Sequence, residues 1–160
     1  MSELTHLNAN HEINMVDVSN KPLSARSATA TGRISMNTSA FTTVLDATSK
    51  KGDVLTTAKI AGIQGAKQCA QLIPLCHPLA LQKVDVMIEP QLDTQSWHVT
   101  CTCKVLGNTG VEMEALTGVQ VALLTMFDMV KALDPNMTIG DVKVIQKTGG
   151  KSGHWERQSG

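Results

Sequence analysis

The sequence predicts an α+β domain in which helices cover one face of an antiparallel sheet. Residues 26–36 alternate strictly between small apolar and polar side chains, as a half-buried strand does. Residues 83–89 and 97–105 alternate in the same way around a short polar segment, which predicts a β-hairpin. Residues 111–133 have the apolar spacing of a long helix. Strands and helices therefore mix without a strict βαβ repeat.

Length and composition exclude several classes of protein. A chain of 160 residues makes one domain and buries about 70% of the surface that its unfolded chain exposes. Fourteen basic residues balance fourteen acidic ones, which argues against a nucleic-acid partner. The N-terminus lacks a basic region followed by an apolar run, and we expect no membrane span. We therefore expect a cytoplasmic protein whose four cysteines are reduced thiols.

The first half of the chain predicts an arm, a strand and two helices. Residues 1–25 have no clear period, so we expect an N-terminal arm before the main domain at 26–148. Asn37 or Thr38 is suited to cap a short helix to about Ala47. The residues expected to face inward from that helix are Phe41, Val44 and Leu45.

Asp53 is suited to cap a second helix, from Val54 to about Leu72. One ridge of this helix consists of very small residues: Ala58, Ala61, Gly62, Gly65, Ala66 and Cys69. Glycine inside a helix costs about 1 kcal/mol against alanine. The ridge therefore predicts close packing against another element or another subunit.

The segment LIPLCHPL, at 72–79, combines two prolines with a cysteine and a histidine. Pro74 and Pro78 prevent helix continuation and favour extended conformations at the residues before them. His77 is then either a satisfied core residue or a side chain presented to a ligand, for phosphate binding or proton transfer.

The long helix is expected to begin near Val111, because Thr109 and Glu112 have the spacing of a capping box. Asp128 and Lys131 are three residues apart beside the apolar face, so we expect them half-buried at its edge. That face, with one polar interruption, should meet the core through Met113, Leu116, Gln120, Leu123, Phe127 and Val130. A purely structural alternative makes the glutamates of the first turn helix-stabilising groups and the Asp128–Lys131 pair a simple ion pair.

A last strand around 142–145 completes the order β-α-α-β-β-α-β. This order predicts a ferredoxin-like split βαβ sandwich with one additional helix. Residues 149–160 form a basic C-terminal tail, which we interpret either as a mobile loop that closes over an anion or as a disordered terminus.

The cysteines also raise the alternative of a zinc hydrolase. Cys76, His77, Cys101 and Cys103 could supply ligands, and that function would require stoichiometric metal. No C-x-x-C pair is present, however, so we expect no metal site.

Five ordered motifs resemble one family across essentially the whole chain. They are GDV at 52–54, LIPLCHPL at 72–79, TGVEMEALT at 109–117, DMVKA at 128–132 and GGKSG at 149–153. The chain resembles the molybdenum cofactor biosynthesis protein C family, the cyclic pyranopterin monophosphate synthases. The resemblance implies a ferredoxin-like subunit in a homohexamer, built as a trimer of dimers with active sites at the dimer interface.

The resemblance also implies a lyase reaction. The substrate, 3′,8-cyclo-7,8-dihydroguanosine 5′-triphosphate, is rearranged to cyclic pyranopterin monophosphate with loss of pyrophosphate. Residues matching the family's pocket are Leu75, Cys76, His77, Met113 and Glu114. The residue matching its catalytic position is Asp128, and lysines matching Lys51 and Lys131 are essential in the family. A contact with the preceding radical enzyme is compatible with this role.

The residue types fit that chemistry. A triphosphate requires several cations, and a guanine-derived ring has N–H groups that carboxylates accept. Cations are available at Arg26, Lys51, His77, Lys131, Lys147 and Lys151. Carboxylates are available at Glu112 and Glu114.

Our hypothesis is that Asp128 and Lys131 form the acid/base pair and that Lys51 is a second proton donor or charge stabiliser. We expect no cofactor, with any Mg²⁺ carried by the substrate phosphates. The competing hypothesis is a non-catalytic oligomeric binding module for a small molecule, which would not need the acid/base pair.

Overall fold

The computed structural model describes residues 4–46 and 53–159. Its five-stranded sheet has the order β2-β3-β1-β4-β5, and every neighbouring pair is antiparallel. The strands are β1 Ser24–Ser35, β2 Lys83–Gln91, β3 Ser96–Gly107, β4 Thr138–Thr148 and β5 Trp155–Glu156. The helices are α1 Thr38–Leu45, α2 Val54–Lys67, α3 Cys69–Leu72 and α4 Glu112–Val130.

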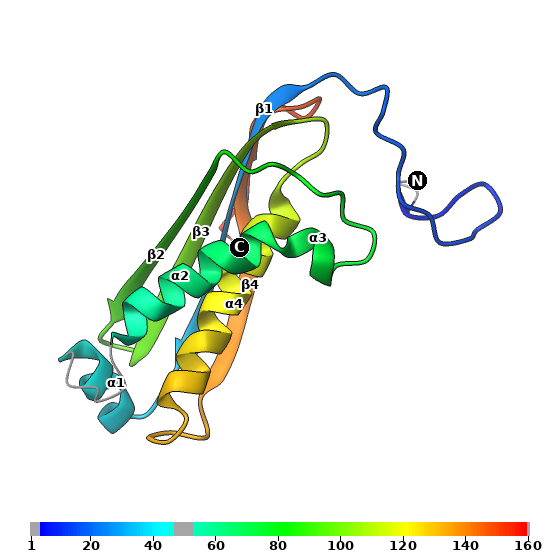
Figure 1. Cartoon of the computed structure of the whole chain (residues 1–160). Coiled ribbons are helices and arrows are strands. Elements are labelled where there is room, and N and C mark those ends of the chain that lie inside the picture. Colours follow the sequence, from blue (N-terminus) through cyan, green and yellow to red (C-terminus); the bar gives the residue numbers. More distant parts are fainter. Residues whose placement is uncertain (1–3, 47–52, 160) are drawn as a thin grey trace.

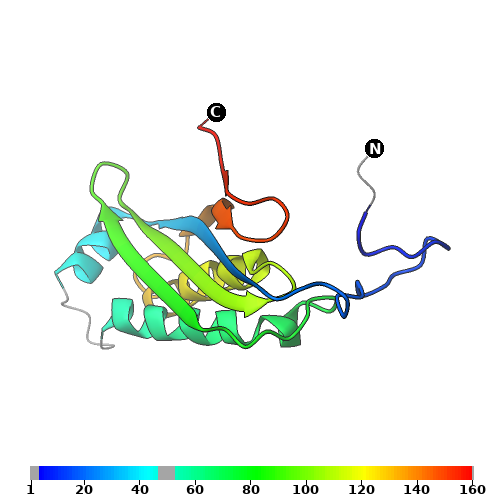
Figure 2. The ribbon, with the colours of Figure 1, turned by 90° about the horizontal axis from the view of Figure 1, so that it is seen from above.

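The elements form two layers. Helices α2 and α4 lie against one face of the sheet, while the N-terminal arm extends away from one end of it (Figures 1 and 2). This confirms the predicted α+β class and is consistent with the ferredoxin-like plan. Two details differ from the predicted order. The short strand β5 pairs with β4, and α3 is separated from α2 at Gln68.

Strand β1 lies between β3 and β4 and supplies the centre of the core. Its small side chains Ala28 and Ala30 are almost fully buried, and so is Ile34. Because side chains alternate along a strand, the opposite face is polar. There the Thr29 hydroxyl lies 2.9 Å from the Thr102 hydroxyl of β3.

The two predicted helix caps are confirmed. The Asn37 side chain accepts a hydrogen bond from the Ala40 backbone N–H at 2.8 Å, and Asp53 accepts one from Thr56 N–H at 3.0 Å. The prediction of the inward face of α1 was only partly correct, because Leu45 is exposed. Ala47 lies outside the described residues.

The small residues of α2 pack against α4. A Cβ atom placed on Gly62 would lie 2.9 Å from the Gly118 carbonyl oxygen, and one on Gly65 would lie 2.7 Å from Val121 Cβ. These distances leave no room for a methyl group. The prediction of close packing is confirmed, and its partner is a second helix of the same chain.

The predicted core face of α4 was wrong in part. Met113 and Gln120 are exposed, whereas the helix residues with no exposed surface are Ala115, Val119, Ala122, Leu123 and Met126. Since α4 touches both the sheet and α2, its apolar surface is wider than one stripe. By length and composition alone α4 could cross a bilayer, but half of it is buried inside this domain, as in a core helix.

Candidate functional site

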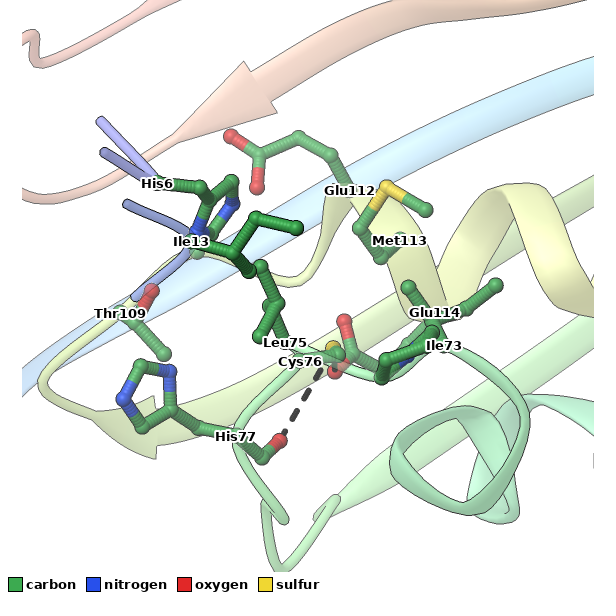
Figure 3. Close-up of a pocket in the computed structure, with 12 residues that line it drawn as sticks. His6, Ile13, Ile73, Leu75, Cys76, His77, Thr109, Glu112, Met113 and Glu114 are labelled. Carbon is green, nitrogen blue, oxygen red and sulfur yellow. Dashed lines mark hydrogen bonds between the residues drawn. The ribbon is translucent and has the colours of Figure 1, made fainter. Parts of the chain in front are cut away.

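A pocket of about 550 Å³ opens where α4 begins. We call it the apolar pocket. It is lined by His6 and Ile13 of the arm, by residues 73–77 of the proline-rich loop, and by residues 109–110 and 112–114. Figure 3 shows these side chains gathered from the three segments. The structure therefore brings together Leu75, Cys76, His77, Met113, Glu112 and Glu114, as predicted.

The arm is attached to the rim of this pocket by two polar contacts. His77 Nε2 lies 2.7 Å from the Val16 carbonyl oxygen. The Asn108 side-chain amide donates to the Val18 carbonyl oxygen at 3.1 Å. His77 is half-buried and also lines the pocket, so it is both partnered by backbone and placed next to a ligand.

One wall of the pocket belongs to a sulfur-rich cluster that consists of Cys69, Cys76, Glu114 and Thr117. Cys76 Sγ donates to Glu114 Oε1 at 3.5 Å, and Cys76 Sγ lies 3.8 Å from Cys69 Sγ. The Thr117 hydroxyl donates to Cys69 Sγ at 3.4 Å. Glu114 is 3% exposed, and its Oε2 has no hydrogen-bond partner among the described residues. In Figure 3 the Glu114 carboxylate lies beside the Cys76 sulfur.

The cluster favours uncharged side chains. Burial raises the pKa of Glu114, partly opposed by its own backbone N–H and by the Cys76 thiol. Burial, followed by the nearby Glu114, raises the pKa of Cys76 to about 12. Burial also raises the pKa of Cys69, against a smaller opposing effect of the Thr117 hydroxyl. Among the described residues no cation is a main cause of these pKa shifts, and all three shifts favour the protonated, uncharged forms.

A second, smaller hollow adjoins the apolar pocket, and Gly110 and Glu112 line both. We call it the cationic shelf. Its other lining residues are Arg26, Ser27, Lys147, Thr148, Gly149, Lys151 and Ser152. Lys147 Nζ lies 3.3 Å from Glu112 Oε1, and Arg26 Nε donates to the Gly107 carbonyl oxygen at 3.2 Å. The chain turns at Gly149 with φ of 91°, a conformation that favours glycine.

The predicted capping box at the start of α4 was wrong. The cap residue is Val111, whose side chain makes no capping hydrogen bond. The Glu112 carboxylate instead faces Lys147 of β4, 35 positions along the chain. Glu112 therefore makes a long-range ion pair rather than the predicted local capping bond.

Asp128 and Lys131 pair at the other end of α4, with Lys131 Nζ 2.6 Å from Asp128 Oδ1. Their side chains are 70% and 55% exposed, so the expectation that they are half-buried was wrong for this chain. At a rise of about 1.5 Å per residue, the fourteen steps along the helix from Glu114 to Asp128 span about 21 Å. One chain therefore does not place this pair in the apolar pocket.

Two other predicted groups are placed differently. Lys51 lies outside the described residues; Asp53, two positions later, caps α2. Cys101 and Cys103 are buried in the core with their sulfurs 3.9 Å apart. They do not join His77 in a ligand set among the described residues, where the one potential metal-binding trio is Cys69, Cys76 and Glu114.

Sequence reasoning missed Cys69 and the arm residues His6 and Ile13 as parts of this region. Cys69 was read only as one of the small residues of α2. The six residues between Cys69 and Cys76 match no ligand spacing that would have indicated their contact.

Comparison with known protein families matches residues 15–150 to the MoaC family. This chain belongs to the MoaC family. A relative from Parvibaculum lavamentivorans, named cyclic pyranopterin monophosphate synthase, is 50% identical over 154 residues, which cover 96% of each chain. The region that matches the family contains the pocket residues between positions 73 and 114, Lys147 of the shelf and the Asp128–Lys131 pair.

Proposed function

We propose that this chain is a cyclic pyranopterin monophosphate synthase of molybdenum cofactor biosynthesis. It would convert 3′,8-cyclo-7,8-dihydroguanosine 5′-triphosphate into cyclic pyranopterin monophosphate and pyrophosphate. The observation that carries the proposal is the continuity of the apolar pocket with the cationic shelf through Glu112. A flat heterocycle that bears a triphosphate needs these two environments side by side.

The ring occupies the apolar pocket in this proposal. Leu75 and Met113 provide apolar contacts, and Glu112 and Glu114 accept hydrogen bonds from ring N–H groups. Cys76 and His77 complete the wall. Backbone contacts to the arm fix the rim on which His77 lies, so the ring meets a positioned rather than a freely rotating imidazole.

The triphosphate occupies the cationic shelf. Arg26 and Lys147 provide charged donors, and Lys151 lies in the tail that borders the same hollow. The glycine turn at 149–150 lets the backbone approach the phosphates closely. The tail would then close over the anion, as its composition suggests.

The acid/base groups come from a second subunit. Asp128 and Lys131 are about 21 Å along α4 from Glu114, so one chain cannot bring both groups to the same reacting atoms. A symmetric dimer can place the far end of one α4 beside the pocket of its partner, since such an interface exchanges equivalent surfaces. This supports the homohexamer with interfacial active sites that the family resemblance implies.

In that arrangement Asp128 and Lys131 move protons during ring opening and reclosure, as already paired groups. Lys51 is assigned as a second proton donor or charge stabiliser on the resemblance. We propose no resident cofactor, because any Mg²⁺ would enter on the substrate phosphates. The enzyme would act in the cytoplasm, where a contact with the preceding radical enzyme would deliver its substrate.

The direct test is to incubate the purified protein with freshly prepared 3′,8-cyclo-7,8-dihydroguanosine triphosphate. Pyrophosphate release and formation of the pterin product should occur together and at equal rates. Tight binding without turnover would overturn the proposal and indicate the non-catalytic binding module instead.

A further inference from the structure

We propose that Cys69, Cys76 and Glu114 form a binding site for Zn²⁺, and that occupation of this site inhibits the enzyme. The three side chains come from α3, from the proline-rich loop and from the first turn of α4. Their ligand atoms all lie within 4.8 Å of one another. The inhibitory part rests on the proposed function, whereas the binding part does not.

The spacing of the ligand atoms fits a tetrahedral ion. With Zn–S bonds of about 2.3 Å, two thiolates on one Zn²⁺ are about 3.8 Å apart, and a thiolate and a carboxylate oxygen are about 3.5 Å apart. The sulfurs of Cys69 and Cys76 are 3.8 Å apart, and Cys76 Sγ is 3.5 Å from Glu114 Oε1. Two edges of the tetrahedron therefore exist already, and the third, between Cys69 Sγ and the Glu114 carboxylate, is no longer than 4.8 Å.

The unpartnered oxygen of Glu114 points to a missing ligand. Only 3% of the Glu114 surface is exposed, and its Oε2 has no hydrogen-bond partner among the described residues. Leaving a buried polar atom unpaired costs free energy, so such an atom usually has an unseen partner. A divalent cation bound to this carboxylate would compensate the charge that the unpaired oxygen shares with Oε1.

The donor types select the ion. Thiolates favour Zn²⁺ over Mg²⁺ or Ca²⁺, which prefer oxygen ligands. The Thr117 hydroxyl, which donates to Cys69 Sγ, would hold that thiolate in place as an outer-shell partner. Cys76 lines the apolar pocket and gives the ion a route from solvent. Three protein ligands leave one open position, which is typical of an exchangeable rather than a closed structural site.

Inhibition follows from the position of two of the ligands. Cys76 and Glu114 belong to the wall that contacts the substrate ring in the proposed function. An ion between Cys76 and Glu114 would turn the Glu114 carboxylate toward Cys69 and away from ring N–H groups. Cys69 does not line the pocket, so the third ligand is available for substitution without touching the substrate.

The test measures metal binding on the full-length protein without substrate. The protein is stripped of metal, kept reduced with a phosphine, and titrated with Zn²⁺ against a chromogenic chelator. We expect one Zn²⁺ per chain, and affinity at least about tenfold weaker in Cys69→Ala and in Glu114→Gln. Cys103→Ala, which removes an equally buried thiol outside the cluster, should keep full affinity. Melting curves check that each variant folds.

Cobalt identifies the geometry. Co²⁺ added to the wild type should give a thiolate-to-cobalt charge-transfer band and tetrahedral visible bands, and Cys69→Ala should lose them. Absence of stoichiometric Zn²⁺ binding in the wild type, or equal binding by Cys69→Ala, would overturn the proposed site whatever the enzyme's activity.

A separate assay tests inhibition. Zn²⁺ should reduce pyrophosphate release by the wild type, and a chelator should restore it. Cys69→Ala should retain its turnover and lose sensitivity to Zn²⁺ in the same substrate solution, which controls for Zn²⁺ bound by the triphosphate. Full activity of zinc-loaded wild type would refute the inhibitory role and leave the synthase reaction itself unaffected.

Discussion

Lys147 Nζ lies 3.3 Å from Glu112 Oε1, and this ion pair stands at the boundary between the apolar pocket and the cationic shelf. The two side chains are 39% and 32% exposed, so solvent screens their attraction. A pair of this kind stabilises a fold by at most about 1 kcal/mol. Its position suggests a different use: an arriving phosphate would take Lys147 and free the Glu112 carboxylate for the ring.

Replacement of the lysine tests that use. Lys147→Ala should change the free energy of unfolding by less than about 1 kcal/mol, yet raise the substrate KM because a phosphate contact is lost. Urea denaturation and steady-state kinetics measure the two effects. Lys143→Ala is the matched control, because Lys143 is on the same strand and pairs with Asp141 at 3.1 Å, away from both hollows. Equal KM values in the two variants would contradict the phosphate role.

The Asp128–Lys131 pair should matter for catalysis and not for stability. Asp128→Asn and Lys131→Ala should each lower turnover by about 10²- to 10⁴-fold, the usual contribution of general acid/base catalysis. Because both side chains are more than half exposed, their unfolding free energies should change little. Asp93→Asn, in the exposed turn between β2 and β3, is a control for loss of one surface carboxylate. Near-normal turnover in both variants would remove them from the mechanism.

Mixed oligomers test whether two subunits build one site. Asp128→Asn and Glu114→Gln are each expected to be inactive, but oligomers reassembled from both should regain roughly a quarter of wild-type activity if symmetric pairs share sites. In a hybrid, one pocket then combines an intact Glu114 with an intact Asp128 from its partner. Asp128→Asn mixed with Lys131→Ala should regain nothing, since both groups come from the same chain end. Equal recovery in the two mixtures would refute the interfacial site.

Gly118 tests the close packing of α2 and α4. A Cβ atom there would lie 2.6 Å from Cys101 Sγ and 3.2 Å from the Gly62 carbonyl oxygen. Gly118→Ala should therefore destabilise the protein by about 1–3 kcal/mol through overpacking. Helix propensity alone predicts the opposite sign, because alanine is favoured by about 1 kcal/mol. Urea denaturation decides between them, with Gly140→Ala as control, where a Cβ atom meets nothing within 4 Å.

Glu114 should make stability depend on pH. Burial holds its pKa above the ordinary carboxyl value, so the folded state binds the proton more tightly than the unfolded state. Wild-type stability should therefore fall as pH rises from the ordinary value towards the raised one. Glu114→Gln lacks this loss. Its unfolding free energy relative to wild type should be higher at neutral pH than below about pH 4.

Urea denaturation at both pH values, with a chelator present, measures this difference. Glu89→Gln, on the exposed side of β2, supplies the background effect of losing a carboxylate. A difference between wild type and Glu114→Gln that does not change with pH would show that Glu114 has an ordinary pKa in the folded protein.

The sequence alone determined the class of the fold, most element positions and those residues of the apolar pocket that lie in the proline-rich loop and at the start of α4. Alternation of apolar and polar residues identified β1 and the β2–β3 hairpin. Asn37 and Asp53 were recognised as helix caps and marked the starts of α1 and α2. These features depend on neighbours a few positions apart, which a sequence displays directly. The predicted pocket residues and the proposed catalytic residues came from the family motifs rather than from periodicity.

Only the tertiary structure decided which surfaces meet. Helix α4 has apolar residues around much of its circumference, because the sheet and α2 bury different sides of it, so spacing alone could not select its core face. Glu112 pairs with Lys147 instead of forming the predicted capping box. Cys69 lies beside Cys76 and Glu114. Asp128 was separated from the pocket by the length of α4. Each of these relationships joins distant segments, and their free energies depend on packing that the linear order does not specify.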